Sequence, residues 1–221
     1  KYGSAWPMRA TVCTCLSCGL AQLDYVVSGD ELYRKNYPYL SSTTKTGKEH
    51  FHGMARDICK KFSFGKSNFA IDIGSNIGVL LEGFKNEGLK VLGIDPATNI
   101  AKLANEGGIE TLPEFFNSSI AKKVLKKYGK ADVVTGTNVF AHVDELDDMV
   151  SAVKELLKDN GIFVIEVPYL VDLIEKLEYD TIYHEHLSYV SVKPLVKYFA
   201  KFSMEVFDVQ RYPIHGGTIR V

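Results

Sequence analysis

Residues 69–78 read Phe-Ala-Ile-Asp-Ile-Gly-Ser-Asn-Ile-Gly, and this stretch decides the fold. Its first half is apolar on both faces, which is typical of a buried parallel strand. Gly74 and Gly78 allow a tight turn and a close approach of the backbone to a ligand. Apolar residues then recur at helical spacing from Val79 to Phe84. The stretch therefore predicts a strand, a ligand-binding loop and a helix in succession.

The rest of the chain repeats this alternation of short apolar runs and amphipathic segments. We predict strands at 90–95, 109–112, 131–137, 161–167, 205–211 and 217–221. We predict helices at 45–62, from Pro96 onward, at 144–157 with Asn160-Gly161 as its end, and near 192–202. This alternation is typical of an α/β fold, a Rossmann-like doubly wound parallel sheet with helices on both faces.

Length and charge restrict the class of protein. With 221 residues, the chain suits an N-terminal lobe (1–36), a helical linker or lid (37–64) and a main domain (65–221). The net charge of −1 gives no field that would attract nucleic acid or an anionic membrane. No apolar run approaches the roughly 18 residues that cross a bilayer. We therefore expect a small-molecule partner and a monomer or a homodimer.

Ligands of such sheets bind outside the carboxyl ends of the strands. A dinucleotide site would need Gly-x-Gly-x-x-Gly, but Asn76 and Val79 stand where the second and third glycines belong. Asp95 ends the second predicted strand, where a carboxylate can accept hydrogen bonds from both ribose hydroxyls of a nucleoside. Asp95 could equally cap a helix that has Pro96 in its first turn. Residues 114–116, Glu-Phe-Phe, suit either an adenine contact or a core aromatic pair.

Together these features over residues 65–167 resemble the class I S-adenosylmethionine-dependent methyltransferases, in which the middle glycine of the loop is sometimes replaced. The resemblance implies S-adenosylmethionine as the cofactor. Tyr37 and Tyr39 would then form part of a lid, or else a packed hinge. The implied cofactor-binding residues are Tyr39, Asp72, Gly74, Ser75, Asn76, Gly78, Asp95, Pro96, Glu114, Phe115 and Asn138.

Six further motifs lie along nearly the whole chain. They are Cys-Leu-Ser-Cys-Gly-Leu-Ala-Gln-Leu at 15–23, Tyr-Pro-Tyr-Leu-Ser-Ser-Thr at 37–43, Asn-Val-Phe-Ala-His-Val at 138–143 with Glu-Val-Pro-Tyr at 166–169, Tyr-His-Glu-His-Leu-Ser-Tyr at 183–189, and Ile-His-Gly-Gly at 214–217. They resemble the nucleotide-sugar C-methyltransferases, which methylate C3 of keto-deoxysugars linked to dTDP. The resemblance implies that Tyr183, Glu185 and His186 contact the sugar.

Methylation of carbon requires a carbanion equivalent, which a 4-keto sugar provides when its C3 proton is lost. A histidine, with a reference pKa of about 6.5, suits the base, and hydrogen-bond donors must stabilise the enolate oxygen. The resemblance makes His186 the base. An extended strand would point Tyr183 and Glu185 away from His186, so we expect a turn or bulge there. His142 either lies near the sulfonium or sugar or is a buried or helix-capping histidine.

Two other histidines admit simpler interpretations. His184 and His186, two residues apart, could bind a metal, but methyl transfer from a sulfonium needs none. His215, beside two glycines, suits a structural role. We therefore expect no catalytic metal.

The cysteines are clustered at one end of the chain. Cys15 and Cys18 form a Cys-x-x-Cys-Gly knuckle that suits half of a structural zinc site, with Cys13 as a third candidate ligand. A reduced thiol pair and a redox pair are the alternatives. The family that the motifs resemble carries four cysteines in this lobe and a further C-terminal domain, so we expect a fragment or a shortened relative. The free thiols favour a cytoplasmic setting.

Three functions follow from these observations. The first is C-methylation of a keto-deoxysugar nucleotide through an enolate. The second is O- or N-methylation of another small metabolite with the same cofactor half. The third is an inactive nucleoside-binding module, for which the Tyr-His-Glu-His cluster at 183–186 has no evident use.

Overall fold

The computed structural model describes residues 10–34, 37–41 and 44–221. The chain forms two compact units. The larger comprises residues 29–139 and 145–165, and the smaller comprises residues 1–28, 140–144 and 166–221. The predicted N-terminal lobe extends into residues 1–9 and 35–36, which lie outside the described residues, as do Ser42 and Thr43 of the second family motif. The predicted division of the chain into a lobe, a linker and a main domain, with boundaries after residues 36 and 64, stays a prediction.

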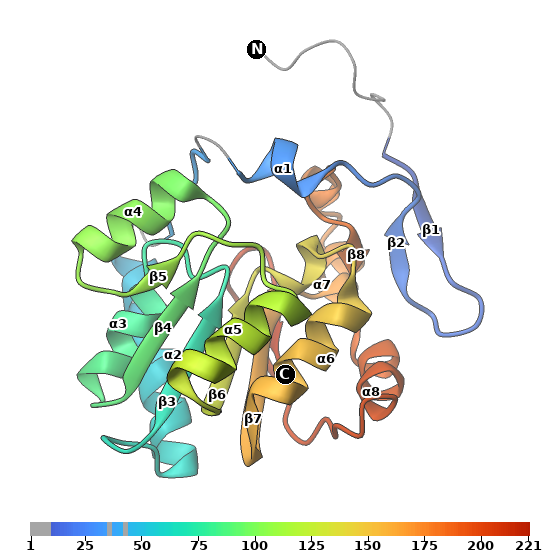
Figure 1. Cartoon of the computed structure of the whole chain (residues 1–221). Helices are drawn as coiled ribbons and strands as arrows, with labels where there is room; N and C mark the ends of the chain where they lie inside the picture. The colour runs from blue at the N-terminus through green and yellow to red at the C-terminus, as the bar shows by residue number, and fades with distance from the viewer. Residues whose placement is uncertain (1–9, 35–36, 42–43) are drawn as a thin grey trace. The chain divides into compact units, whose positions relative to one another are not determined.

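The larger unit is built on a parallel sheet (Figure 1). Its strands lie in the order β5 (Thr111–Leu112), β4 (Lys90–Ile94), β3 (Phe69–Ile73), β6 (Ala131–Thr137) and β7 (Leu157–Pro168), and β7 runs on into the smaller unit. Strand β3 is parallel to β4 and β6, and β4 is parallel to β5. The chain therefore winds outward from β3 in both directions, which confirms the doubly wound α/β prediction.

Helices cover both faces of this sheet (Figure 1). On one face, α2 (Lys45–Phe62) and α3 (Val79–Asn86) pack together over a core that includes Met54, Phe84 and Val133. In Figure 1, α5 (Ser118–Tyr128) and α6 (Leu146–Leu156) lie in front of the strands, and their residues contact one another. The bounds of α2 are those that the apolar spacing predicts.

Two predicted boundaries are wrong. Helix α4 (Thr98–Glu106) begins two residues after Pro96, and Ala97 is its N-cap, so Asp95 is not the capping residue. Helix α6 ends at Leu156 and β7 begins at the next residue, so Asn160-Gly161 lies within a strand and does not end the helix. Asn160-Gly161 favours a turn only through its local conformational preference. Here that preference is outweighed by the pairing of the long strand β7.

The smaller unit contains antiparallel strands. Strands β1 (Val12–Thr14), β2 (Ala21–Leu23) and β8 (Ser188–Tyr189) form a three-stranded sheet. Strand β10 (Thr218–Arg220) pairs antiparallel with the end of β7 and with β9 (Gln210–Tyr212), which completes a seven-stranded order. The strand predicted at 217–221 is confirmed as β10, and the strand predicted at 205–211 corresponds to β9, which begins five residues later than predicted. The alternation of strands and helices did not predict the antiparallel pairing of these strands, nor did it predict β1, β2 and β8.

The remaining elements of this unit are α7 (Leu170–Glu175), α8 (Val192–Ala200) and two short 3-10 helices, η1 (Phe140–His142) and η2 (Tyr179–Thr181). A buried ion pair joins β10 to β7, because Arg220 Nη2 lies 2.8 Å from Glu166 Oε2. Helix α1 (Gly29–Leu32) belongs to the larger unit. Within the described ranges, no helix has the length and apolarity that a membrane span requires.

Candidate functional site

The loop after β3 has the backbone that a close-fitting ligand loop needs. Gly74 has φ +65°, and a Cβ atom there would overlap the side chain of Val139. Gly78 has φ +82°, and a Cβ atom there would lie 2.7 Å from Ile109. Both positions therefore require glycine for conformation and for space. Asn76, between them, also has a left-handed backbone, with φ +51°.

Two buried carboxylates lie at or near the carboxyl ends of the central strands. Asp95, 6% exposed, follows β4, and its two oxygens accept the backbone N–H groups of Asn76 and Ala97, each at 2.9 Å. Asp72, 2% exposed, accepts the hydroxyl of Thr135 at 2.6 Å. Burial raises the pKa of Asp72 to about 7. The hydrogen bond from Thr135 lowers this pKa, and the charge of Asp95 raises it by a smaller amount. Burial also raises the pKa of Asp95, although both backbone bonds lower it.

The other predicted cofactor residues surround the same edge of the larger unit. Ser75 is buried, and its hydroxyl has no hydrogen-bond partner among the described residues. Phe115 is partly buried, with the guanidinium of Arg34 5.0 Å from its ring centre. Asn138 follows β6 with φ +54°. Glu114 and Pro96 are also partly buried, whereas Tyr39 is 51% exposed. Their contacts with a cofactor stay predictions.

The smaller unit brings together three of the predicted catalytic side chains. His186 Nε2 lies 3.1 Å from the hydroxyl of Tyr183, and the His142 ring centre is 4.9 Å from that of His186. The expected turn is present, because the backbone N–H of His186 donates to the carbonyl of Tyr183 at 3.0 Å. The turn brings the two side chains together, as an extended strand would not.

A backbone carbonyl fixes the tautomer of His186. Nδ1 lies 2.7 Å from the carbonyl oxygen of Thr181, and a carbonyl only accepts, so Nδ1 carries the proton. Nε2 therefore carries the lone pair, with which it accepts the hydrogen bond of the Tyr183 hydroxyl. Burial lowers the pKa of His186, although the Thr181 bond opposes this. Burial, and then the neighbouring His186, lowers the pKa of His142 to about 3.

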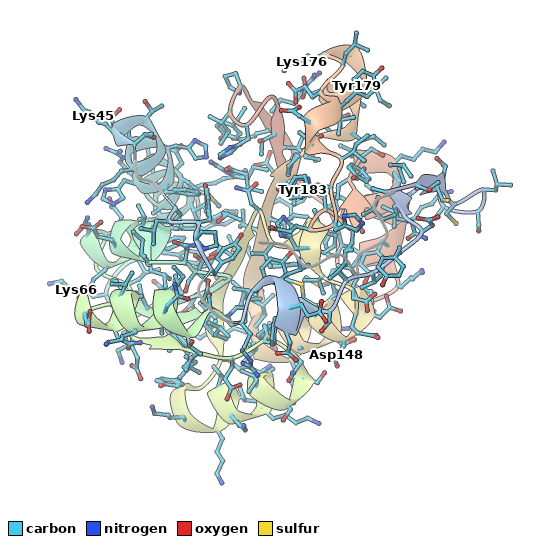
Figure 2. The ribbon with its side chains drawn as sticks, turned by 90° about the horizontal axis from the view of Figure 1, so that it is seen from above. Lys45, Lys66, Asp148, Lys176, Tyr179 and Tyr183 are labelled. Atoms are coloured by element: carbon cyan, nitrogen blue, oxygen red, sulfur yellow. The ribbon has the colours of Figure 1, made fainter. Side chains whose placement is uncertain are left out.

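The remaining candidates lie close by in the sequence. Glu185 and His184 are partly buried, and the rings of His184 and Tyr25 meet edge to face with centres 6.4 Å apart. In Figure 2, Lys176 and Tyr179 lie together at one end of this unit, and Tyr183 lies apart from them. Thr181 was not predicted from the sequence. It contacts His186 through its backbone carbonyl, which every residue type has, so its side chain gave no signal.

Cys15 and Cys18 lie in one turn that a backbone hydrogen bond closes. The backbone N–H of Gly19 donates to the carbonyl of Cys15 at 2.8 Å. The backbone N–H groups of Cys18 and Ser17 lower the pKa of the Cys15 thiol. No cluster of three or more potential ligands occurs among the residues that the structure describes. The role of these two thiols as zinc ligands stays a prediction.

Comparison with known proteins was made by sequence and by structure. A family model described as "Methyltransferase domain" matches residues 46–208, which is more than half of the chain. The C-methyltransferase NovU of Streptomyces niveus is 35% identical over 211 residues, covering 95% of this chain and 50% of that protein. A ubiquinone biosynthesis O-methyltransferase of Rhodopseudomonas palustris is 30% identical over 115 residues, covering 48% of this chain and 45% of that protein. The chain thus spans about half the length of these curated relatives.

Solved structures share the fold at low sequence identity. A SAM-dependent methyltransferase from Archaeoglobus fulgidus has a TM-score of 0.52 and 22% identity, covering 74% of each chain. Magnesium protoporphyrin IX methyltransferase from Synechocystis, solved with bound SAH, has a TM-score of 0.58 and 12% identity, covering 78% of this chain and 81% of that chain. The chain therefore belongs to the methyltransferase domain family and has the fold of the class I S-adenosylmethionine-dependent methyltransferases.

Proposed function

We propose that the chain binds S-adenosylmethionine and methylates a carbon atom of a small molecule, a keto-deoxysugar nucleotide, with His186 as the base. The observation that carries this proposal is the Tyr183–His186–Thr181 arrangement. It leaves a neutral imidazole with Nε2 as proton acceptor. The 35% identity to a protein named as a C-methyltransferase supports carbon as the acceptor.

Asp95 would hold the ribose of the cofactor. Each of its oxygens already accepts one backbone N–H, and a carboxylate offers about four lone-pair sites. One site on each oxygen therefore remains for the two ribose hydroxyls. The glycine loop of residues 74–78 would let the cofactor approach the backbone closely, as the positive φ of Gly74 and Gly78 supports.

His186 would start the reaction at the sugar. Its Nε2 takes the proton from C3, and the electron pair moves onto the oxygen at C4 as an enolate. In the free protein the Tyr183 hydroxyl donates to Nε2. With sugar bound, this hydroxyl would turn to donate to the C4 oxygen, which leaves the Nε2 lone pair for the C3 proton, and Glu185 and His142 would line the sugar site. S-adenosylmethionine, when bound, would supply the electrophilic methyl group that the carbanion at C3 accepts. Because the pKa of His186 is lowered, the imidazole is neutral and able to accept the proton at pH 7.

Deuterium exchange tests the base separately from methyl transfer. The protein is incubated in heavy water with a dTDP-linked 4-keto-deoxysugar, and deuterium at C3 is measured by mass spectrometry. The wild type should exchange this position without cofactor, and His186→Ala should not. His215→Ala is the matched control, because His215 is exposed and outside the cluster. Exchange by His186→Ala at the wild-type rate would remove the assignment of the base.

The same assay separates the alternative functions. An O- or N-methyltransferase would transfer the methyl group to another metabolite but leave C3 unlabelled. An inactive nucleoside-binding module would bind the cofactor with neither exchange nor turnover. The C-methyl proposal requires both exchange and a methylated sugar.

We also propose that Cys15 and Cys18 supply two ligands to a structural zinc ion. Their knuckle and the lowered pKa of Cys15 support this role, since thiolates are the ligating form. Zinc content measured by mass spectrometry should fall in Cys15→Ser and stay constant in Cys59→Ser, a buried cysteine of α2. Equal zinc content in the two variants would refute this assignment.

A further inference from the structure

Part of the larger unit's N-terminal segment crosses the carboxyl ends of three strands. We call residues 29–34 and 37–41 the strap. At Gly29 an added Cβ atom would lie 3.2 Å from Phe115, which follows β5. The carbonyl of Arg34 accepts the backbone N–H of Thr98, which follows β4, at 3.5 Å. The strap then reaches Asn76, which follows β3. It therefore passes over the edge where the proposed function places the nucleoside.

Asn76 holds the strap with its side-chain amide. Its Oδ1 accepts the backbone N–H of Ser41 at 2.9 Å, and its Nδ2 donates to the carbonyl of Tyr39 at 3.0 Å. One amide group thus pairs with a donor and an acceptor of the strap backbone. The second glycine of a Gly-x-Gly loop could make neither bond, because it has no side chain.

Asn99, in the first turn of α4, makes the same kind of pair. Its Oδ1 accepts the backbone N–H of Tyr37 at 3.3 Å, and its Nδ2 donates to the carbonyl of Tyr37 at 3.0 Å. The rings of Tyr33 and Tyr37 meet edge to face with centres 5.6 Å apart, and the centres of Tyr37 and Tyr39 are 6.5 Å apart. The two asparagines therefore hold the backbone of Tyr37 and Tyr39, and the ring of Tyr33 contacts that of Tyr37.

The Asn76 bond also connects the strap to Asp95. The backbone N–H of Asn76 donates to Asp95 Oδ2, while the Asn76 side chain binds residues 39 and 41. A single residue with a left-handed backbone thus joins the proposed ribose carboxylate to the strap.

From this geometry we infer that Asn76 and Asn99 are positioning residues that fasten residues 37–41 across the nucleoside crevice, so that the strap retains the bound cofactor. The inference rests on the proposed function. It explains why an asparagine stands at the middle glycine position: the side chain is used, and the positive φ is one that asparagine tolerates.

Asn76→Gly tests the inference with little disturbance of the loop. Glycine tolerates φ +51°, and the bond to Asp95 comes from the backbone, so both are kept while the side-chain pair is lost. The variant loses the two bonds to the strap and also the bond that Asn76 Oδ1 accepts from the backbone N–H of Ile77 at 2.9 Å. Loss of the two strap bonds should speed amide exchange at Ser41 about tenfold, measured by NMR, and should speed release of S-adenosylhomocysteine by a similar factor. Asn76→Asp keeps the acceptor for Ser41 but loses the donor to Tyr39, so it should give intermediate values.

Asn99→Ala and Asn68→Ala complete the experiment. Asn99→Ala should speed exchange at Tyr37 and release of S-adenosylhomocysteine. Asn68→Ala is the control, because its Oδ1 accepts the backbone N–H of Gly65 at 2.8 Å, just before β3 at the amino end of the strand. It should change neither readout.

If amide exchange at Ser41 were as slow in Asn76→Gly as in the wild type, the inference that Asn76 holds the strap would be wrong. Faster exchange with unchanged release of S-adenosylhomocysteine would overturn the role of the strap in retaining the cofactor. If the wild type bound no S-adenosylhomocysteine, the proposed function would fail, whereas the exchange comparison in the free protein would still decide whether Asn76 fastens the strap.

Discussion

Asp72→Asn should make the stability of the protein less dependent on pH. Asp72 is 2% exposed near the carboxyl end of β3, and burial raises its pKa to about 7 from the ordinary value of 3.8. A carboxyl group with a raised pKa binds its proton more tightly in the folded state than in the unfolded state. The wild type should therefore lose stability as the pH rises from about 4 to about 7, and the full loss persists above pH 7.

The size of this effect follows from the difference in pKa. Each pH unit of difference corresponds to about 1.4 kcal/mol, so the charged carboxylate costs the folded state about 4 kcal/mol above pH 7. Between pH 5 and pH 8.5, the free energy of unfolding of the wild type should fall by about 3 kcal/mol from this group. Asparagine keeps an oxygen to accept the Thr135 hydroxyl and stays neutral, so this part of the pH dependence should vanish.

Urea unfolding followed by far-ultraviolet circular dichroism measures the free energy of unfolding at each pH. Asp132→Asn is the control. Burial raises the pKa of Asp132, but its bonds from Lys158, Asn68 and the backbone of Phe69 outweigh burial and leave the pKa low. This variant should be destabilised by a similar amount at pH 5 and pH 8.5. The reasoning about Asp72 is refuted if Asp72→Asn keeps the wild-type slope between these two values.

Three other perturbations have expected outcomes. Gly74→Ala should lower the thermal midpoint, because φ +65° and the overlap with Val139 cost at least about 1–2 kcal/mol, and adding Val139→Ala should restore part of the loss. Arg220→Met should cost about 3–5 kcal/mol in urea unfolding, because it removes the cationic partner of the buried Glu166 carboxylate, whereas Glu166→Gln with Arg220→Met should recover much of this loss. The rate of C3 exchange should fall with decreasing pH only below 6.5, because the pKa of His186 is lowered; a fall that begins above pH 7 would contradict the proposed base.

The parts of the fold that could be predicted are those whose pattern lies in consecutive residues. The apolar run of β3, the glycines of its loop and the spacing of α2 all reside in consecutive residues, and the structure confirms each. A strand at 217–221 was predicted, but the antiparallel place of this strand, β10, beside β7 was not. Its place beside β7 depends on pairing with residues 166–168, about 50 positions earlier in the chain.

The candidate site shows the same limit. The sequence indicated Asn76 only as a replacement for glycine, and its use became visible only in bonds to residues 39 and 41. Thr135 was not singled out, although its hydroxyl reaches Asp72 from 63 positions away. Hydrogen bonds between distant residues leave no periodic pattern, so sequence periodicity reveals the elements but not these contacts.

Calorimetric titration with S-adenosylhomocysteine tests the central claim, that Asp95 holds the nucleoside of the cofactor, most directly. The wild type should bind with measurable heat. Asp95→Asn, shown to be folded by circular dichroism, should bind about 10- to 100-fold more weakly, because hydrogen bonds to a charged acceptor contribute about 1.5–3 kcal/mol. Equal affinity of the two proteins, or no heat with the wild type, would contradict the account.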